Sequence, residues 1–382
     1  MSTIYDFALV GAATPKQVEE LSKAIQIVVQ GLGLELGVEV GWAVKPAQFS
    51  PDEAKASALL YFGGEAGTES FVRAATQQAI PIVPVVSRMD RVQLELPEEL
   101  WALNAIEYDA AGAERIASAL LESAGLLPRQ RRVFISYRRD ESRVAALQLL
   151  GELAARHYEV FIDTHAIQPG EDFQAVLWDR LCDSDALIML DTATYFGSRW
   201  TSAEFGRALA KGIPILRIGW PTVQASPRTA IATHIDLAAA DISSDDSTIC
   251  SNAISRICLS LEALRSLSTA VRRRNFASKI ELGVKAIGGS VDGFGKGGSI
   301  HVRLPSGKPL VAHPALGVPT ARTLHRARQL SPGEDVVVVY DHVGLSASSI
   351  EHLDWIGEHV ATPKWIKLYE ASWRLADWEV AK

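Results

Sequence analysis

Residues 131–221 constrain the fold more than any other stretch of the chain. Short apolar runs at residues 133–137, 159–163, 184–190 and 212–216 alternate here with amphipathic segments long enough to form helices. An apolar run of this length indicates a buried strand, and strands that alternate with helices indicate parallel pairing. We therefore expect an α/β fold in which helices cover both faces of a parallel sheet.

Polar and aromatic residues follow the expected strands, at the edge where an open parallel sheet binds its ligands. They are Tyr137, Arg138 and Arg139 after the first strand, Asp163 after the second, and Trp200 and Glu204 after the third. Two arginines can hold a pyrophosphate by bidentate hydrogen bonds, and the rings of Tyr137, Phe161 or Trp200 can stack on adenine or nicotinamide. This set of side chains suits a dinucleotide.

The order of these segments resembles that of a TIR (Toll/interleukin-1 receptor) domain over residues 131–265. Residues 133–137, Val-Phe-Ile-Ser-Tyr, are similar to the first strand of the family, and residues 163–173 are similar to its BB loop. Trp200 and Glu204 resemble the tryptophan and the catalytic glutamate of the members that hydrolyse NAD+. The sequence Ser-Tyr-Arg-Arg at residues 136–139 is also similar to the animal axon-degeneration NADase and to bacterial defence TIR domains.

This resemblance implies an NAD+ nucleosidase in which Glu204 is catalytic, NAD+ is the substrate and no cofactor is required. The substrate-binding residues are then expected to be Tyr137, Arg138, Arg139, Phe161, Asp163 and Trp200. The BB-loop residues that contact a neighbouring protomer are expected to be Ile167, Pro169, Gly170, Asp172 and Phe173. The likeness also implies self-association into a dimer or a filament, activity after assembly, and a role as an antiphage immune effector.

The reaction accounts for a single carboxylate. Ordinary glycoside hydrolysis uses two carboxyl groups, because one of them must protonate a poor leaving group. Nicotinamide leaves a positively charged nitrogen as a neutral molecule, so one carboxylate that stabilises the developing oxocarbenium charge suffices. Attack by water gives ADP-ribose, whereas attack by the adenine or a ribose hydroxyl of the substrate gives a cyclic product.

A purely structural interpretation of Glu204 competes with the catalytic one. The sequence Thr-Ser-Ala-Glu at residues 201–204 fits a capping box, with Glu204 reaching back to the amide of Thr201. Trp200 and Phe205 fit the hydrophobic staple that accompanies such a cap. Glutamine also satisfies a capping box, so the substitution Glu204→Gln separates the two roles.

The alternative function, from another class, is a non-catalytic TIR adaptor that scaffolds partner proteins through the BB loop. An adaptor needs neither Trp200 nor Glu204, so the presence of both favours the enzyme. A second alternative is a receptor for a nucleotide signal, in which the C-terminal domain binds the ligand and the TIR domain responds.

Three domains are expected: a flavodoxin-like domain at residues 1–127, the TIR domain at residues 131–268 and a small C-terminal α/β domain at residues 275–382. Helices are predicted at residues 15–29, with Thr14 as the cap, at residues 173–182 and at residues 247–271, and the second strand of the first domain is predicted at residues 36–42.

The first domain is expected to be a degenerate copy of the second. Residues 79–83 align with residues 212–216, and residues 57–61 then fall close to residues 185–189. In this alignment Phe71 stands in the place of Glu204, so the first copy lacks the carboxylate and has a packing or regulatory role. The alternative is that any two flavodoxin-like sheets align this well.

The C-terminal domain is expected to sense a signal or to drive assembly, with a nucleotide or a partner protein as its ligand. Its glycine-rich segment at residues 287–299 superficially resembles a phosphate loop, but it leads into an expected strand at residues 300–304 and is interpreted as a flexible turn. Four tryptophans fit a small core or an interface: Trp355, Trp365, Trp373 and Trp378. Six histidines lack ligand spacing, so no metal site is expected.

Charge and cysteine content limit the partners and the compartment. The net charge of −7 argues against a broad nucleic-acid surface, and the basic clusters at residues 129–132 and 272–274 are interpreted as solvated linker charge. The three cysteines show no metal spacing, and Cys250 and Cys258 fit one buried helix face. With no signal peptide and no apolar run of eighteen residues, we expect a soluble, cytoplasmic protein without disulfides or membrane contact.

Overall fold

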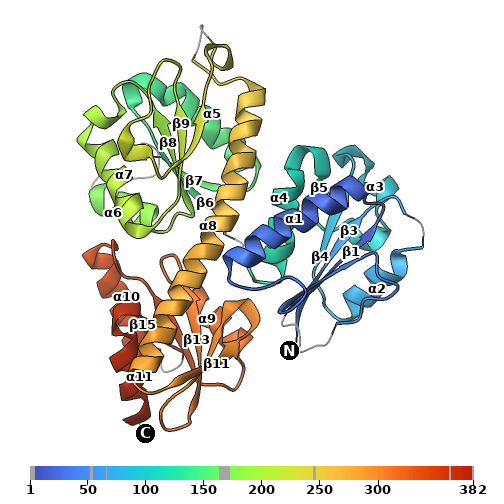
Figure 1. The fold of residues 1–382 in the computed structure, drawn as a ribbon, viewed down its shortest axis with the longest axis vertical. Coiled ribbons are helices and arrows are strands. Elements are labelled where there is room, and N and C mark those ends of the chain that lie inside the picture. The colour runs from blue at the N-terminus through green and yellow to red at the C-terminus, as the bar shows by residue number, and fades with distance from the viewer. Residues whose placement is uncertain are drawn as a thin grey trace.

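The computed structural model describes residues 5–51, 55–65, 67–128, 130–162, 173–243, 247–360 and 363–380. Its strands form three five-stranded sheets that follow one another along the chain, and we call the parts built on them the first, central and C-terminal units. The long helix α8 (Ser251–Ala286) connects the central and C-terminal units and lies beside the first unit (Figure 1).

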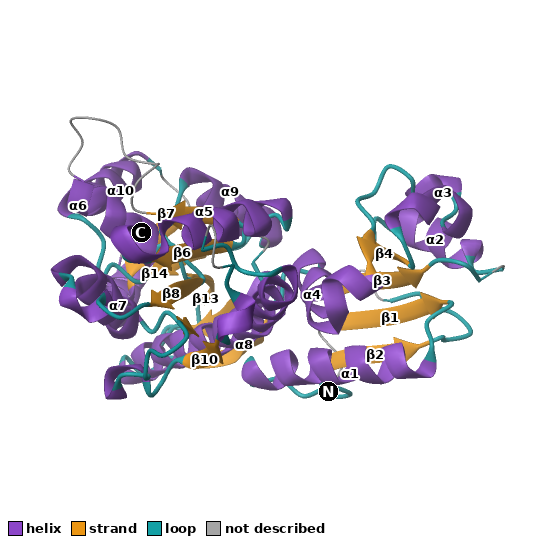
Figure 2. Ribbon diagram, turned by 90° about the horizontal axis from the view of Figure 1, so that it is seen from above, coloured by secondary structure: helices purple, strands orange, loops and turns teal. Residues whose placement is uncertain are grey.

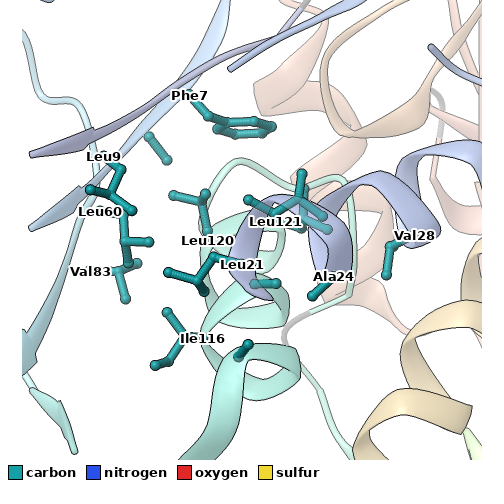
Figure 3. Packing of buried hydrophobic residues seen from close by; sticks show 14 of the residues in the cluster. Phe7, Leu9, Leu21, Ala24, Val28, Leu60, Val83, Ile116, Leu120 and Leu121 are labelled. Atoms are coloured by element: carbon teal, nitrogen blue, oxygen red, sulfur yellow. The ribbon is translucent and has the colours of Figure 1, made fainter. Parts of the chain in front are cut away.

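The first unit contains a parallel sheet with the strand order β2-β1-β3-β4-β5. Its strands are β1 (Tyr5–Gly11), β2 (Val40–Val44), β3 (Ala56–Phe62), β4 (Ile82–Val86) and β5 (Ile106–Glu107). Helices α1 (Pro15–Gly31) and α4 (Tyr108–Ser123) cover one face of the sheet, and α2 (Glu69–Gln77) and α3 (Val92–Glu95) lie on the other (Figure 2). Leucines from both layers, such as Leu9, Leu21 and Leu120, meet in the core between the sheet and α1 and α4 (Figure 3).

Helix α1 begins as the sequence predicts. Thr14 is the N-cap and forms a capping box with Gln17, and Pro15 occupies the first turn. The second strand differs from the prediction, because it was expected at residues 36–42 and β2 begins at Val40. The amide of Gly37 donates to the carbonyl of Val40 (2.8 Å), and this turn delays the entry of the chain into the sheet.

The central unit repeats this topology. Its sheet has the order β10-β9-β8-β6-β7, which is the same flavodoxin-like arrangement when strands are counted from the start of the unit. The strands are β6 (Arg132–Ser136), β7 (Glu159–Ile162), β8 (Ala186–Asp191), β9 (Ile215–Gly219) and β10 (Thr233–Asp236). Helices α5 (Arg139–Ala155) and α8 pack on one face, and α6 (Phe173–Cys182) and α7 (Arg199–Lys211) pack on the other.

The ends of helices α2 and α7 support the predicted alignment of the two units. The amide of Ile80 donates to the carbonyl of Ala75 (2.8 Å), and the amide of Ile213 donates to that of Ala208 (2.8 Å). Each turn passes through a left-handed residue, Ala79 with φ 53° or Gly212 with φ 67°. In this register Phe71 takes the place of Glu204.

The C-terminal unit contains a mixed sheet with the order β11-β12-β13-β14-β15. The strands are β11 (Ser290–Phe294), β12 (Ile300–Arg303), β13 (Pro309–Ala315), β14 (Val336–Tyr340) and β15 (Lys364–Lys367). The first three pair antiparallel and the last three pair parallel. Helices α8 and α11 (Ala371–Val380) pack on one face, and α9 (Ala321–Leu330) and α10 (Ala347–His359) pack on the other. The predicted α/β class, with flavodoxin-like parallel sheets and a C-terminal α/β unit, is confirmed.

Short 3-10 helices join these elements, at η1 (Met89–Arg91), η2 (Glu98–Leu100), η3 (Tyr195–Gly197), η4 (Pro227–Thr229), η5 (Ala239–Asp241), η6 (Lys296–Gly298) and η7 (Leu368–Glu370).

The glycine-rich segment is a β-hairpin, and its interpretation as a flexible turn was wrong for its first half. Residues 290–294 form β11, which pairs with β12, and η6 makes the connection between the two strands. A phosphate loop would lead into a helix, whereas this segment leads into a strand.

The tryptophans of the C-terminal unit divide between core and surface. Trp365 and Trp378 pack against its two apolar clusters, whereas Trp355 and Trp373 are about half exposed. Cys250 is exposed at the N-cap of α8, so the prediction that it shares a buried helix face with Cys258 was wrong.

Helix α8 is longer than predicted and runs through residues 268–275, the expected linker between the second and third domains. Arg273 of this segment is not solvated linker charge, because it donates to the carbonyls of Gly125 and Leu126 (3.2 and 2.5 Å) and to that of Gly297. These bonds join the first and C-terminal units to one helix.

A buried ionic cluster lies where the first and central units meet α8. Arg265 donates to the carboxylates of Glu122 (2.8 Å) and Asp185 (2.9 Å), and to the carbonyls of Pro128 (3.0 Å) and Gln130 (2.8 Å). One turn earlier on α8, Glu262 accepts hydrogen bonds from Arg131 and from the hydroxyl of Tyr158 (2.8 Å). The basic cluster at residues 129–132 is therefore partly structural, since Arg131 is buried and paired.

Candidate active site

The candidate site lies at the carboxyl ends of β6 and β8, which are neighbours in the central sheet. Ser136 is the last residue of β6 and pairs in register with Met189 of β8. After β8 the chain passes through η3 and enters α7, which carries Trp200 and Glu204. The sheet thus brings Ser136 and the start of α7 to one edge.

Helix α7 begins three residues before the start that a capping box at Thr201 requires. Its N-cap is Ser198, whose hydroxyl accepts a hydrogen bond from the amide of Trp200 (3.2 Å). The hydroxyl of Thr201 donates instead to the carbonyls of Tyr195 and Ser198. The predicted capping box and staple were therefore wrong, because the serine captures the helix start and Glu204 falls in the second turn.

The carboxyl group of Glu204 is directed at the end of β6. Its Oε2 accepts a hydrogen bond from the hydroxyl of Ser136, and the side chain is only 3% exposed. The hydroxyl of Ser136 is also bonded to that of Tyr195 (2.6 Å). Since the serine proton is donated to Glu204, Tyr195 must be the donor in the second bond.

Tyr195 retains its proton under ordinary conditions. Its ring is fully buried, and this burial, together with the nearby charge of Glu204, raises the pKa of Tyr195 well above the ordinary value. The result is an ordered chain of donors, from Tyr195 to Ser136 to Glu204. A carboxyl group held in this way has a fixed orientation, which suits it to stabilise a positive charge that develops nearby.

Trp200 lies one helical turn before Glu204 and is available to a ligand. Its side chain is 37% exposed, and the guanidinium of Arg199 lies 4.5 Å from the centre of the indole ring. The contact is a cation–π interaction at the surface.

Arg138 and Arg139 diverge after β6. Arg138 is the N-cap of α5 and donates through Nε to the hydroxyl of Thr194 (3.1 Å), whereas Arg139 is exposed in the first turn. Glu141 accepts from the same hydroxyl (2.8 Å). Desolvation opposes its charge, but the hydrogen bonds from the amide and the hydroxyl of Thr194 prevail and lower the pKa of Glu141. This rim of charged groups connects the loop after β8 to the start of α5.

Two predicted substrate-binding rings lie in the apolar core. Tyr137 packs against the cluster beneath α5 and α8, and Phe161 packs in the cluster beneath α6 and α7, with Arg180 4.8 Å from its ring centre. Both side chains are less than a tenth exposed, so neither offers a stacking face in this arrangement. Their predicted contact with a substrate stays a prediction.

The predicted BB loop lies mostly outside the described residues. Asp163, Ile167, Pro169, Gly170 and Asp172 all fall in the undescribed range 163–172. Phe173 is the first residue of α6, and the structure describes its backbone alone.

Sequence analysis missed the buried pair of Arg217 and Asp191. Arg217 lies within β9 and donates through Nε to Asp191 (2.6 Å) at the end of β8 and through Nη1 to Asp236 (2.6 Å) at the end of β10. An arginine inside the apolar run Ile-Leu-Arg-Ile was the signal, because a buried charge requires a partner. The pair fixes three adjacent strand ends.

The described residues hold neither a cluster of potential metal ligands nor a potential membrane-spanning helix. Within residues 5–51, 55–65, 67–128, 130–162, 173–243, 247–360 and 363–380, no group of three or more His, Cys, Asp or Glu side chains is placed to hold a metal ion. In the same ranges, no helix combines the length and apolar character needed to cross a bilayer.

Comparison with known proteins identifies the central unit. A family model described as "TIR domain" matches residues 133–249. No curated protein matches the chain. Among solved structures, the chain is similar to a mutant form of the XylFII-LytSN complex, with 9% identity over 72% of this chain and 92% of that chain. The TM-score of 0.18 is too low to support any argument from that likeness.

Proposed function

We propose, since residues 133–249 form a TIR domain, that this domain cleaves the nicotinamide–ribose bond of NAD+. One observation carries the proposal: the carboxyl group of Glu204 accepts a hydrogen bond from Ser136 at the carboxyl end of the sheet, one turn from the exposed indole of Trp200. A side chain needed only to cap a helix would bond to backbone amides at the helix start. Glu204 is instead held by a hydroxyl from another element.

The step requires little from the protein. The bond between C1′ of the ribose and the nicotinamide nitrogen breaks, and its electron pair neutralises the positive charge of the pyridinium. The carboxylate of Glu204 stabilises the oxocarbenium ion that forms. Water then bonds to C1′ and releases its second proton to solvent, which gives ADP-ribose. Attack by an adenine nitrogen or a ribose hydroxyl of the same molecule gives a cyclic product instead.

The remaining roles follow from the same placement. Trp200 provides a stacking surface for nicotinamide or adenine, and Arg138 and Arg139 bind the pyrophosphate. Because Glu204 is 3% exposed, access of a substrate requires a rearrangement, and assembly of TIR domains through residues 163–173 would provide it. We propose that the chain acts in the cytoplasm as an immune effector that works after self-association.

The test is NAD+ consumption with identification of the products, measured over a range of protein concentrations. Glu204→Gln should keep the fold and remove cleavage, because the amide is nearly isosteric but cannot stabilise a positive charge. Glu152→Gln is the matched control, since Glu152 lies on α5 and pairs with Arg156 (2.7 Å). Equal turnover by the Glu204 variant and the wild type excludes Glu204 from the mechanism.

The alternative is a TIR adaptor without catalytic activity. The specific observation in its favour is the burial of Glu204 together with the rings of Tyr137 and Phe161, which leaves few of the expected substrate contacts exposed in a single chain. An adaptor predicts self-association without loss of NAD+ at any protein concentration. The assay above therefore separates the two functions.

A further inference from the structure

The C-terminal unit binds the end of helix α6. Asp179 accepts hydrogen bonds from the amide of Ser346 (2.8 Å) and from the hydroxyls of Ser346 (2.8 Å) and Ser349 (2.5 Å). The carboxylate thus sits at the first turn of α10, where the helix dipole favours a negative charge. Asp183, one turn later, accepts from the amide of Val318 (2.9 Å).

The same unit binds the end of helix α7. Lys211, the last residue of α7, forms an ion pair with Asp341 (2.9 Å) and donates to the carbonyls of Asp341 (3.1 Å) and Val343. Between the two helix ends, the thiol of Cys182 donates to the carbonyl of Gly344 (3.1 Å). We call this set of contacts the latch: Asp179, Cys182, Asp183 and Lys211 with Val318, Asp341, Val343, Gly344, Ser346 and Ser349.

The two latched helices are the ones that the candidate site depends on. Helix α6 follows directly after residues 163–172, and α7 carries Glu204 two turns before Lys211. The helices also contact each other, with the guanidinium of Arg207 3.7 Å from the ring centre of Trp178. A movement that exposes Glu204 must therefore shift helices whose ends the C-terminal unit holds.

The latch is a polar interface of the kind that can open. Its members are carboxylates, hydroxyls, a thiol, an amine and backbone groups, and polar contacts between parts of a chain are typical of interfaces that open. An open cavity of about 390 Å³ borders it and is lined in part by Val318, Thr320, Ser349 and His352. The interface is thus adjacent to solvent.

We propose that the latch holds the TIR domain in a closed, single-chain arrangement and that its release permits self-association and access to Glu204. The claim about access to Glu204 rests on the proposed function and is measured by NAD+ cleavage. The claim about self-association does not rest on it and is measured by the protein concentration at which the chain associates.

Two substitutions in the C-terminal unit should open the latch. Asp341→Lys places a cation against Lys211, and Ser349→Asp places an anion against Asp179 while adding an acidic residue to the first turn of α10, where it favours the helix. We expect each variant to self-associate at about tenfold lower protein concentration than the wild type, because like charges opposed in an interface are strongly unfavourable. Sedimentation velocity measures this concentration, and circular dichroism checks the fold.

Asp354→Lys is the matched control. It makes the same charge change on the same unit, but Asp354 pairs with Lys367 (3.1 Å) within that unit. Its association should equal that of the wild type.

A disulfide provides the reverse test. A Cβ atom at Gly344 would lie 2.8 Å from the sulfur of Cys182, so Gly344→Cys places two thiols within bonding reach, at the cost of backbone strain from the positive φ of 84° at this position. Oxidation of this variant, alone or combined with Asp341→Lys, should keep the chain monomeric, and reduction should restore association. Wild-type protein treated with the same oxidant is the control.

The outcomes separate the two proposals. If Asp341→Lys and Ser349→Asp speed hydrogen exchange in α6 but associate no more readily than the wild type, the latch does not control assembly and the inference is overturned. Earlier association without NAD+ cleavage in any variant supports the latch and removes the proposed function. Glu204-dependent cleavage that is equal in latched and released protein supports the function and removes the latch as its regulator.

Discussion

Replacing Arg265 by methionine removes the charge that joins the first unit, the central unit and helix α8. Burial alone would lower the pKa of Arg265, but the carboxylates of Asp185 and Glu122 raise it above the ordinary value, so the guanidinium is charged. Methionine fills much of the same volume but leaves both carboxylates without this partner. Breaking a buried ion pair from one side typically costs about 3–5 kcal/mol.

The remaining contacts place the expected cost at the lower end of that range. Glu122 keeps Arg115 at 3.6 Å, and Asp185 keeps the amide of Arg132 at 3.1 Å. We therefore expect Arg265→Met to lower the free energy of unfolding by about 3 kcal/mol. With a urea dependence of about 2 kcal/mol per molar, the midpoint of the transition that includes the first and central units falls by roughly 1.5 M.

The assay is urea unfolding of the full chain, followed by tryptophan fluorescence and circular dichroism. Arg256→Met is the matched control on the same helix, because the side chain of Arg256 is 50% exposed and its pair with Asp241 (2.8 Å) is worth less than about 1 kcal/mol. Adding Glu122→Gln to Arg265→Met should recover part of the loss, since one of the two buried carboxylates that lose Arg265 becomes neutral. If the Arg265 and Arg256 variants unfold at the same midpoint, the buried cluster does not stabilise the junction.

Three further predictions follow from individual residues. Ser136→Ala should reduce NAD+ cleavage by about 10- to 100-fold, because it removes a hydrogen bond to the carboxyl group of Glu204; unchanged kinetics would exclude Ser136 from positioning that group. Burial lowers the pKa of His313 from 6.5 to about 4, so its neutral form is favoured in the fold and stability is lost as the pH falls from 6.5 towards 4. Urea titrations should show that His313→Gln removes about 2 kcal/mol of the difference between pH 8 and pH 5, and an unaltered difference would contradict the assignment. Finally, Gly212→Ala should destabilise the central unit by about 1 kcal/mol, and Ala79→Gly should stabilise the first unit by a similar amount, since both positions have positive φ. If the two substitutions shift the thermal unfolding temperature in the same direction, the argument from backbone strain is refuted.

The sequence alone determined the positions of β6, β7, β8 and β9 in the central sheet. Apolar runs bounded by turn residues gave β6, β8 and β9 within a residue or three, and α6 at its observed bounds, because burial of a parallel strand on both faces leaves a continuous apolar signature. The alignment of the two units was also predicted from the sequence. Residues 79–83 and 212–216 have similar sequences, and both segments begin with a residue of positive φ, Ala79 and Gly212.

Long-range polar contacts could not be predicted from the sequence, because a hydrogen bond between residues far apart in the chain produces no local sequence pattern. The sequence predicted that the arginines at residues 272–274 are solvated linker charge. In the structure, Arg273 donates hydrogen bonds to the carbonyls of Gly125 and Leu126. The same limitation hid the latch, whose partners come from α6, α7 and the C-terminal unit.

The candidate active site shows most clearly what the sequence predicted and what only the tertiary structure decided. Sequence spacing selected Trp200 and Glu204, and it equally suggested a capping box at Thr201. Only the tertiary structure decided between the two arrangements, because the hydroxyl of Ser198 captures the helix start while the pairing of β6 with β8 brings Ser136 to the carboxyl group of Glu204. Residue types are a property of the chain, but the direction in which a buried carboxyl group points depends on which neighbours the fold supplies.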